Sequence, residues 1–129
     1  MKLVFFNLRE DEKSALESWR NAHPEVEIDV YTEELSSANK HLLEGKQGVV
    51  LAQNKPFESD VYEYAHEQGI KVFATRSAGF DIYDLELMNK FGIKMTNVPS
   101  YSPNAIAEHV LTTALRISRN TNKIQRNLE

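Results

Sequence analysis

Two patterns alternate along the chain: short strand-like apolar runs, and longer stretches with apolar residues at helical spacing. The strand-like runs are residues 2–6, 26–31, 48–52, 70–75 and 93–96, as expected of buried parallel strands. Between them, residues 10–23, 32–43, 59–68 and 81–91 show helical spacing, and each stretch ends near a proline or glycine. This alternation predicts an α/β fold: a doubly wound parallel five-stranded sheet in the flavodoxin-like strand order.

The longest helical pattern follows a loop that contains Pro99 and Pro103. Pro99 excludes helix from the approach, whereas Ser102 is placed to cap a helix whose first position is Pro103, where a missing N–H costs nothing. The loop is therefore predicted to be stiff. It would hold the Tyr101 hydroxyl at a fixed position beside a cleft, with a purely structural tyrosine as the alternative.

Apolar residues of this last helix occupy more surface than one sheet face would cover. A partner or a further domain is expected to cover the surplus, and two chains that cover each other in this way would form a homodimer. Past Asn120 the chain is polar and has no glycine or proline stop signal, as expected of a piece of a longer protein. The apolar positions are Ile106, Val110, Ile117 and Ile124 on one side and Leu111, Ala114 and Leu115 on the other.

The chain has 129 residues, a net charge of -4 and no cysteine. This length suits one domain with a sizeable core. A mildly acidic balance without a basic face argues against nucleic acid and anionic membrane surfaces, and favours small-molecule partners. Without a signal-peptide core or an apolar run of about 18 residues, the sequence predicts a cytoplasmic protein with no membrane span. The absence of cysteine is compatible with a reducing compartment.

Ligands of open parallel sheets bind beyond the carboxyl ends of the strands, so the candidate chemistry lies in the segments that follow the predicted strands. Residues 76–81, Arg-Ser-Ala-Gly-Phe-Asp, are the most informative. Gly79 permits a left-handed turn that would aim successive backbone N–H groups into an anion-binding hollow at a helix start. A small carboxylate would suit such a hollow, whereas a merely tight connection is the alternative.

Other kinds of site fail on inspection. The four histidines lie on different predicted elements without a metal-ligand pair, and His109 has either a supporting role near the loop or a structural one. No G-x-G-x-x-G follows a strand, and the acidic residues 10–12 occupy the first connection, where a phosphate loop would be glycine-rich or hydroxyl-rich. The sequence therefore predicts no dinucleotide site and no flavin site, and it lacks the order of residues that nucleophilic hydrolysis needs.

Residues 98–109, Val-Pro-Ser-Tyr-Ser-Pro-Asn-Ala-Ile-Ala-Glu-His, closely resemble the loop and helix start of the NAD-dependent D-2-hydroxyacid dehydrogenases, nearest to the members that act on D-lactate. The likeness extends to residues 8–12 with Trp19, which resemble the family's first loop and helix. Residues 76–81 resemble its substrate loop. The resemblance implies a flavodoxin-like substrate domain interrupted by a Rossmann domain, with residues 1–101 in the substrate domain and 102–129 as a long helix that connects to a cofactor domain absent from this chain.

The resemblance also implies site residues. The backbone amides of Ala78 and Gly79 would bind the carboxylate of a 2-oxo acid, and the Tyr101 hydroxyl would reach the substrate from the other wall. The family's catalytic histidine, glutamate and arginine come from segments beyond Glu129, so no residue here is catalytic, and His109 belongs to the connecting helix. At Ala52 several lactate enzymes of the family carry a tyrosine, so a smaller residue suggests room for a side chain larger than methyl.

These observations give a functional hypothesis with one alternative. The resemblance implies part of an oxidoreductase that interconverts pyruvate, or a related 2-oxo acid, and D-lactate with NADH and NAD. This chain would supply the substrate-binding half, would not bind NAD alone and would be inactive alone. The alternative is a stand-alone ligand-binding or dimerisation module of the same fold.

Overall fold

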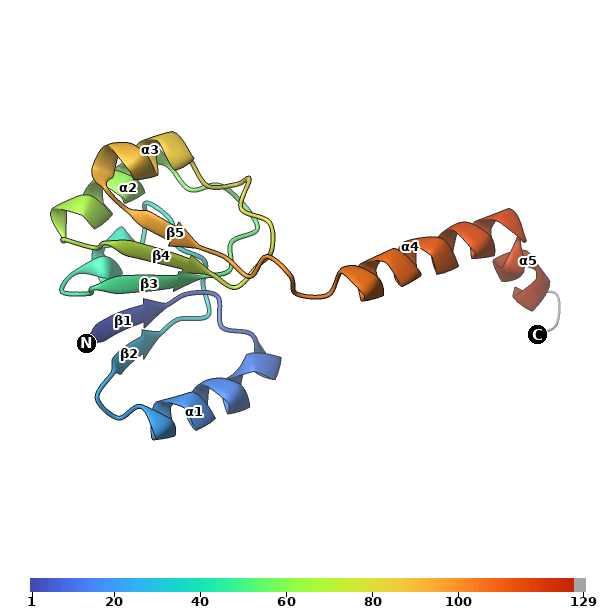
Figure 1. Ribbon diagram of the computed structural model, residues 1–129, viewed down its shortest axis with the longest axis horizontal. Coiled ribbons are helices and arrows are strands. Elements are labelled where there is room, and N and C mark those ends of the chain that lie inside the picture. The colour runs from blue at the N-terminus through green and yellow to red at the C-terminus, as the bar shows by residue number, and fades with distance from the viewer. Residues whose placement is uncertain (127–129) are drawn as a thin grey trace. The chain divides into compact units, whose positions relative to one another are not determined.

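The computed structural model describes residues 1–126, apart from the Asn122 side chain, and divides the chain into one unit of residues 1–99 and a second that begins at Ser100. The first unit is built on five strands that all pair in parallel (Figure 1). Their order β2-β1-β3-β4-β5 is the flavodoxin-like order, which confirms the predicted fold class. The strands are β1 (Lys2–Phe5), β2 (Glu27–Val30), β3 (Gly48–Leu51), β4 (Val72–Thr75) and β5 (Lys94–Thr96).

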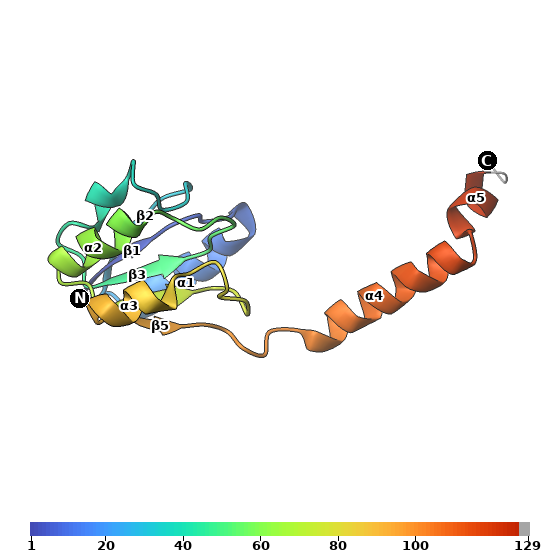
Figure 2. The ribbon, with the colours of Figure 1, turned by 90° about the horizontal axis from the view of Figure 1, so that it is seen from above.

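Helices cover both faces of this sheet, as predicted. Helix α1 (Lys13–Ala22), preceded by the 3-10 turn η1 (Glu10–Glu12), lies on one side, while α2 (Ser59–Glu67) and α3 (Leu85–Phe91) lie on the other (Figures 1 and 2). The 3-10 turn η2 (Lys40–Leu43) precedes β3. Helix α1 ends before Pro24 and α2 ends before Gly69, as their stop signals predict.

The hydrophobic core lies between the sheet and the α2 side. An aromatic cluster occupies it, in which the Phe57 ring centroid lies 4.7 Å from that of Tyr62 and 5.9 Å from that of Tyr83. The α1 side is covered less closely. There Leu16 and Trp19 line a hollow of about 220 Å³ with residues of three strands, and Trp19 remains 39% exposed. The apolar side chains of Leu16 and Trp19 on α1 therefore face the sheet without being fully buried.

The helix predicted over residues 32–43 is wrong except at its end, where only η2 forms. Side chains take up the backbone groups that a helix would need. The Asn39 carboxamide accepts from Ser36 N at 2.8 Å and donates to Glu34 O at 2.9 Å. The Gln53 carboxamide bonds both the N–H and the carbonyl of Leu35, at 3.1 and 2.8 Å. These bonds offer the backbone an alternative to helix.

The second unit contains α4 (Pro103–Ser118) and α5 (Thr121–Arg126). Ser102 and Pro103 occupy the predicted cap and first-turn positions, although the Ser102 hydroxyl makes no capping hydrogen bond. The single long helix predicted from residue 102 is interrupted, because Asn120 has a φ of 51° and separates α4 from α5. The last residues of the helix predicted over 102–129, namely Asn127, Leu128 and Glu129, lie outside the described residues.

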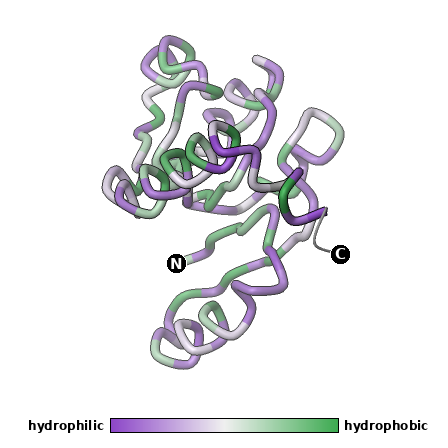
Figure 3. Tube along the Cα trace, turned by 90° about the vertical axis from the view of Figure 1, so that its right-hand side faces the viewer, coloured by the Kyte–Doolittle hydropathy of each residue, from purple (hydrophilic) through white to green (hydrophobic). Residues whose placement is uncertain are grey.

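No residue of α4 is buried. Figure 3 colours the hydrophobic residues green, and they occur along the helices of the chain. The hydrophobic side chains of α4 are exposed, because no other described element of the second unit covers them. Among the described residues, no helix is both long and apolar enough to cross a membrane.

Candidate functional site

The carboxyl ends of the five parallel strands meet at one edge of the sheet, where the arrowheads of Figure 1 point. The loops that leave this edge include residues 7–9, 52–54, 76–80 and 97–98. Open parallel sheets bind ligands there. Residues 76–80, called the substrate loop below, leave β4 and form the centre of the candidate site.

Each backbone carbonyl of the middle of the substrate loop accepts a hydrogen bond from the protein. Ser77 O accepts from Val98 N at 3.0 Å, Ala78 O from Asn97 Nδ2 at 2.8 Å and Gly79 O from Ser77 Oγ at 2.7 Å. The N–H groups of Ala78 and Gly79, in contrast, bond no acceptor among the residues that the structure describes. The carbonyls of the loop are thus bonded within the protein, whereas the backbone N–H groups of Ala78 and Gly79 are available to bind an anion.

A chain of three hydroxyls connects the substrate loop to the core. The Tyr83 hydroxyl lies 3.2 Å from Thr75 Oγ1, and Thr75 Oγ1 lies 2.8 Å from Ser77 Oγ. Thr75 is the one buried polar residue in the described part of the chain. Burial raises the pKa of the Tyr83 phenol, so its hydroxyl keeps its proton and stays a hydrogen-bond donor. The chain of hydroxyls supports Ser77 and, through it, the Gly79 carbonyl.

The conformation predicted for Gly79 is wrong in two respects. Gly45, Gly69 and Gly92 have positive φ, but Gly79 does not, because the substrate loop turns without a left-handed residue. The loop also does not open a helix. Residues 81–84 intervene, and α3 is capped by Asp84, whose Oδ1 accepts from Leu87 N at 2.9 Å.

Nothing in the first unit crowds Gly79. An added Cβ would meet no described atom closer than Asp81 Oδ2, at 4.0 Å. The fold itself therefore does not require glycine at this position, in contrast to Gly48, where a Cβ would lie 3.0 Å from the Leu3 side chain.

Arg76 joins the substrate loop to the loop that follows β1. Its guanidinium makes two bonds to the Glu12 carboxylate, at 3.0 and 2.9 Å, and donates to Phe6 O and Asn7 O at 3.0 and 2.7 Å. Partial burial acts to raise the pKa of Glu12, but the bonds from Arg76 and from the Arg9 N–H, with the charges of both arginines, outweigh it and lower that pKa.

Both arginines at this edge are therefore engaged by carboxylates, since Arg9 also contacts Asp11 and Glu12 at 3.3 Å. Attraction of an anion to the first unit would rest on backbone N–H groups more than on a free positive charge. In the described part of the chain, no group of three or more metal-ligand side chains is placed to hold a metal ion.

Ala52 follows β3, whose end lies between those of β1 and β4. The residue is half-buried, and its carbonyl accepts from Asn7 Nδ2 at 2.6 Å. The side chains that follow it are held elsewhere, Gln53 on the Leu35 backbone and Phe57 in the aromatic cluster. That Ala52 lines a substrate pocket stays a prediction.

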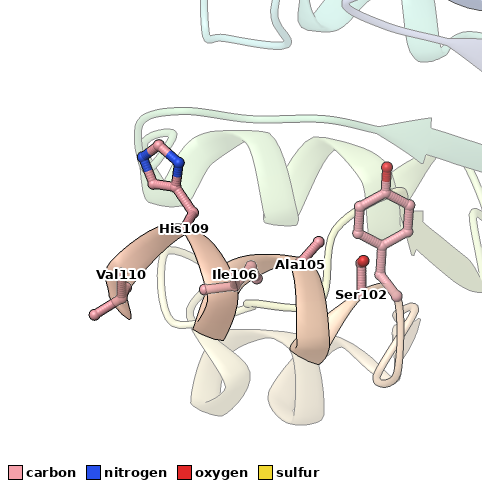
Figure 4. A pocket seen from close by; sticks show the side chains of 6 residues that line it. Ser102, Ala105, Ile106, His109 and Val110 are labelled. Atoms are coloured by element: carbon pink, nitrogen blue, oxygen red, sulfur yellow. The ribbon is translucent and has the colours of Figure 1, made fainter. Parts of the chain in front are cut away.

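Tyr101 and His109 belong to the second unit, whereas Ala78 and Gly79 belong to the first. Tyr101 is 79% exposed. With Ser102, Ala105, Ile106, His109 and Val110 it lines a hollow of about 350 Å³ along the start of α4, whose labelled side chains are drawn in Figure 4. The predicted approach of the Tyr101 hydroxyl to the substrate loop stays a prediction.

The sequence patterns did not show which side chains support the site, namely Asn97, Ser77, Thr75, Tyr83 and the Arg76–Glu12 pair. The sequence contains only a weak indication of two of these residues. Thr75 is a polar residue at the end of an apolar run, and Asn97 follows another.

Comparison with known proteins adds an independent line of evidence. The family model of the D-isomer specific 2-hydroxyacid dehydrogenase, catalytic domain, matches residues 2–129. A D-lactate dehydrogenase of Treponema pallidum is 47% identical over 125 residues, which are 97% of this chain and 38% of that relative. A D-2-hydroxyacid dehydrogenase (NAD(+)) of Clostridioides difficile is 37% identical over 122 residues, which are 94% of this chain and 37% of that relative.

Solved structures agree with the sequence matches. A crystal structure of a Treponema pallidum D-lactate dehydrogenase, 47% identical, superimposes with a TM-score of 0.84 over 97% of this chain and 38% of that one. A D-2-hydroxyisocaproate dehydrogenase, 34% identical, gives the same TM-score over 99% of this chain and 38% of that one. The chain thus spans well under half the length of the relatives it matches.

Proposed function

The chain belongs to the D-isomer specific 2-hydroxyacid dehydrogenases, and on this premise we propose that it forms the substrate-binding part of an oxidoreductase that interconverts pyruvate, or a related 2-oxo acid, and D-lactate with NADH and NAD. The observation that carries this proposal is the substrate loop. Its carbonyls are bonded to the protein while the N–H groups of Ala78 and Gly79 stay available, an arrangement that suits the carboxylate of a 2-oxo acid.

The residues of this chain do not fit the NAD that the family uses. The turn after β1 carries Glu10 and Asp11, both exposed, where a dinucleotide pyrophosphate would need backbone N–H groups and neutral residues. We therefore assign this chain no step that passes through the cofactor. NAD would be held by a Rossmann domain that the chain does not contain, and the chain by itself would be inactive.

Ala52 bears on the substrate within the same proposal. A methyl side chain at this strand end, with Gln53 and Phe57 held by other contacts, favours 2-oxo acids with side chains larger than that of pyruvate. The similar D-2-hydroxyisocaproate dehydrogenase structure is named for a substrate of this larger kind.

The partners we propose are the 2-oxo acid, the Rossmann domain and a second copy of the chain that packs on the apolar side of α4. Light scattering at high protein concentration is expected to show a dimer, and a monomer would contradict that part of the proposal. We also propose a cytoplasmic location, with which the cysteine-free sequence is compatible, since the cytoplasm is a reducing compartment.

The test of carboxylate binding uses oxamate, an analogue of pyruvate, and the full 129-residue chain. We expect oxamate to shift the amide signals of Ala78 and Gly79 in nuclear magnetic resonance spectra. Signals that stay still at high oxamate concentration would contradict the proposal.

Gly79→Ala sharpens this test. The first unit has room for the added methyl group, so the free energy of unfolding should stay the same or rise by up to about 1 kcal/mol. The methyl group would instead meet the ligand, and affinity for oxamate should fall about tenfold or more. A stable variant that binds as tightly as wild type would remove Gly79 from the site.

A further inference from the structure

The Ser77 hydroxyl closes a turn that contains both proposed anion donors. Its Oγ donates to Gly79 O at 2.7 Å, and the ring closed by this bond includes the Ser77–Ala78 and Ala78–Gly79 peptide groups. The N–H groups of Ala78 and Gly79 belong to these two peptide groups. Because each peptide group is planar, only rotations about the single bonds between them change the relative direction of the two N–H groups. The closed ring couples those rotations and so restricts both donors together.

The hydroxyls of Tyr83, Thr75 and Ser77 form a chain of hydrogen bonds that has one direction. A carbonyl oxygen can only accept, so the single Ser77 hydroxyl proton is used in the bond to Gly79 O. Ser77 Oγ therefore accepts in its 2.8 Å bond with Thr75 Oγ1, and Thr75 Oγ1 in turn accepts from the Tyr83 hydroxyl at 3.2 Å. Each hydroxyl donates to the next, and bonds in such a chain polarise one another and strengthen the last one.

The chain of hydroxyls begins in the core and ends at the exposed loop. Thr75 is 4% exposed and Tyr83 is 5% exposed, and the Tyr83 ring packs against Phe57. Ser77 is half-buried, whereas Ala78 and Gly79 are exposed. An unrestrained serine side chain exchanges among three staggered rotamers. The buried Thr75 hydroxyl favours the rotamer in which Ser77 Oγ lies between Thr75 Oγ1 and Gly79 O.

We propose that Ser77 is a positioning residue of the carboxylate site: its hydroxyl closes the turn that holds the N–H groups of Ala78 and Gly79 in place for one anion. Thr75 and Tyr83 orient that hydroxyl from the core and act on the site only through it. This inference rests on the proposed function, because it names the side chain that prepares the two proposed donors. Ser77 itself is not required to touch the substrate.

The first test compares Ser77→Thr with Ser77→Val in the full chain. The two replacements have nearly the same shape and only threonine has a hydroxyl, so any crowding by the added carbon atoms affects both. Ser77→Val should bind oxamate about 2- to 10-fold more weakly than Ser77→Thr. Calorimetric titration measures the affinity of the folded chain, which a loss of global stability alone does not change.

Equal oxamate affinities in Ser77→Thr and Ser77→Val would overturn the inference. If Ser77→Val does not fold, Ser77→Ala is compared with wild type, since it removes only the hydroxyl oxygen. The same 2- to 10-fold loss is expected, at about the strength of one neutral hydrogen bond, and unchanged affinity would again overturn the inference.

The carbonyl carbon of Gly79 provides a readout that needs no ligand. A hydrogen bond to a carbonyl oxygen moves its carbon-13 signal downfield, so Ser77→Val should move the Gly79 signal upfield and Ser77→Thr should not. Thr75→Val interrupts the chain one step further from the loop and should move the signal in the same direction by a smaller amount. An unchanged signal in Thr75→Val would overturn the role given to the core hydroxyls.

The outcomes separate this inference from the proposed function. If wild type binds oxamate through Ala78 and Gly79 while Ser77→Val binds as tightly as Ser77→Thr, the proposed function stands and Ser77 is not a positioning residue. If wild type does not bind oxamate, the proposed function fails. The closed turn is then judged by the Gly79 carbonyl signal alone, and an unchanged signal in Ser77→Val would overturn it as well.

Discussion

The sheet unit and helix α4 contain similar apolar residues in opposite surroundings. Phe73, on β4, is 0% exposed and packs among aromatic rings, whereas Ile117, on α4, is 72% exposed. Residues 1–99 bury most of their apolar side chains between strands and helices of the same unit, and α4 has no such layer in its own unit. A sheet with helices on both faces can close a core, but one helix cannot cover its own apolar surface.

The largest expected effect is a loss of stability confined to the sheet unit. Phe73→Ala should lower the free energy of unfolding by about 3–5 kcal/mol, since it leaves a cavity between the rings of Phe57 and Tyr62. Urea denaturation followed by circular dichroism measures it. Ile117→Ala should change the same free energy by less than about 0.5 kcal/mol. Equal losses of unfolding free energy in the two variants would contradict the contrast between the sheet unit and α4. If Phe73→Ala does not fold, the milder Phe73→Leu takes its place.

Arg76→Met should have the next largest effect, about 2–3 kcal/mol of unfolding free energy, because it removes both Arg76 bonds to the partly buried Glu12 carboxylate and the Arg76 bonds to two backbone carbonyls. Arg9→Met is the matched control. Arg9 is largely exposed, so its removal should cost less than about 0.5 kcal/mol.

The same pair predicts a pH dependence. The pKa of Glu12 is lowered in the folded chain, so the unfolded state binds this proton more readily. The stabilisation is therefore present above the ordinary glutamate pKa and is lost as the pH falls through the lowered value in the fold. Acid titration of stability should show this loss in wild type and a smaller loss in Arg76→Met. Identical acid profiles would show that Arg76 does not hold Glu12 in its charged form.

The fourth prediction concerns α4 and association, with no effect on the sheet unit. Val110→Glu places a charge on the apolar side of α4, which also carries Ile106 and Ile117. Thr112→Glu places the same charge on the polar side. Val110→Glu should weaken the proposed dimer about tenfold or more, since an unpaired charge would be buried at the contact, while Thr112→Glu should not. Sedimentation at several protein concentrations measures both, and equal weakening would remove the apolar side of α4 from the contact.

Sequence patterns were sufficient where one local rule decided the outcome. Continuous apolar runs located all five strands, and Pro24 and Gly69 marked the ends of α1 and α2. Patterns failed where hydrogen bonds from particular side chains decided the backbone conformation. The helix predicted over residues 32–43 was lost to bonds from Asn39 and Gln53, and Gln53 lies 18 residues from its partner Leu35.

The candidate site divides in the same way. The sequence pattern pointed to the substrate loop through a glycine after a strand, at the edge where parallel sheets bind ligands, and the resemblance to the family implied the amides of Ala78 and Gly79. It assigned Gly79 the wrong conformation, because the pattern around one glycine does not show which neighbours hold its backbone.

The sequence by itself determined the α/β class, the positions of the five strands and the surplus of apolar residues on α4, because periodicity and stop signals are local properties of the chain. Only the tertiary structure decided which donors hold the substrate loop. The bond from Asn97 to Ala78 spans 19 residues and those from Arg76 to Glu12 span 64. Such contacts depend on which strands become neighbours in the sheet, and parallel pairing brings together residues that no local pattern relates.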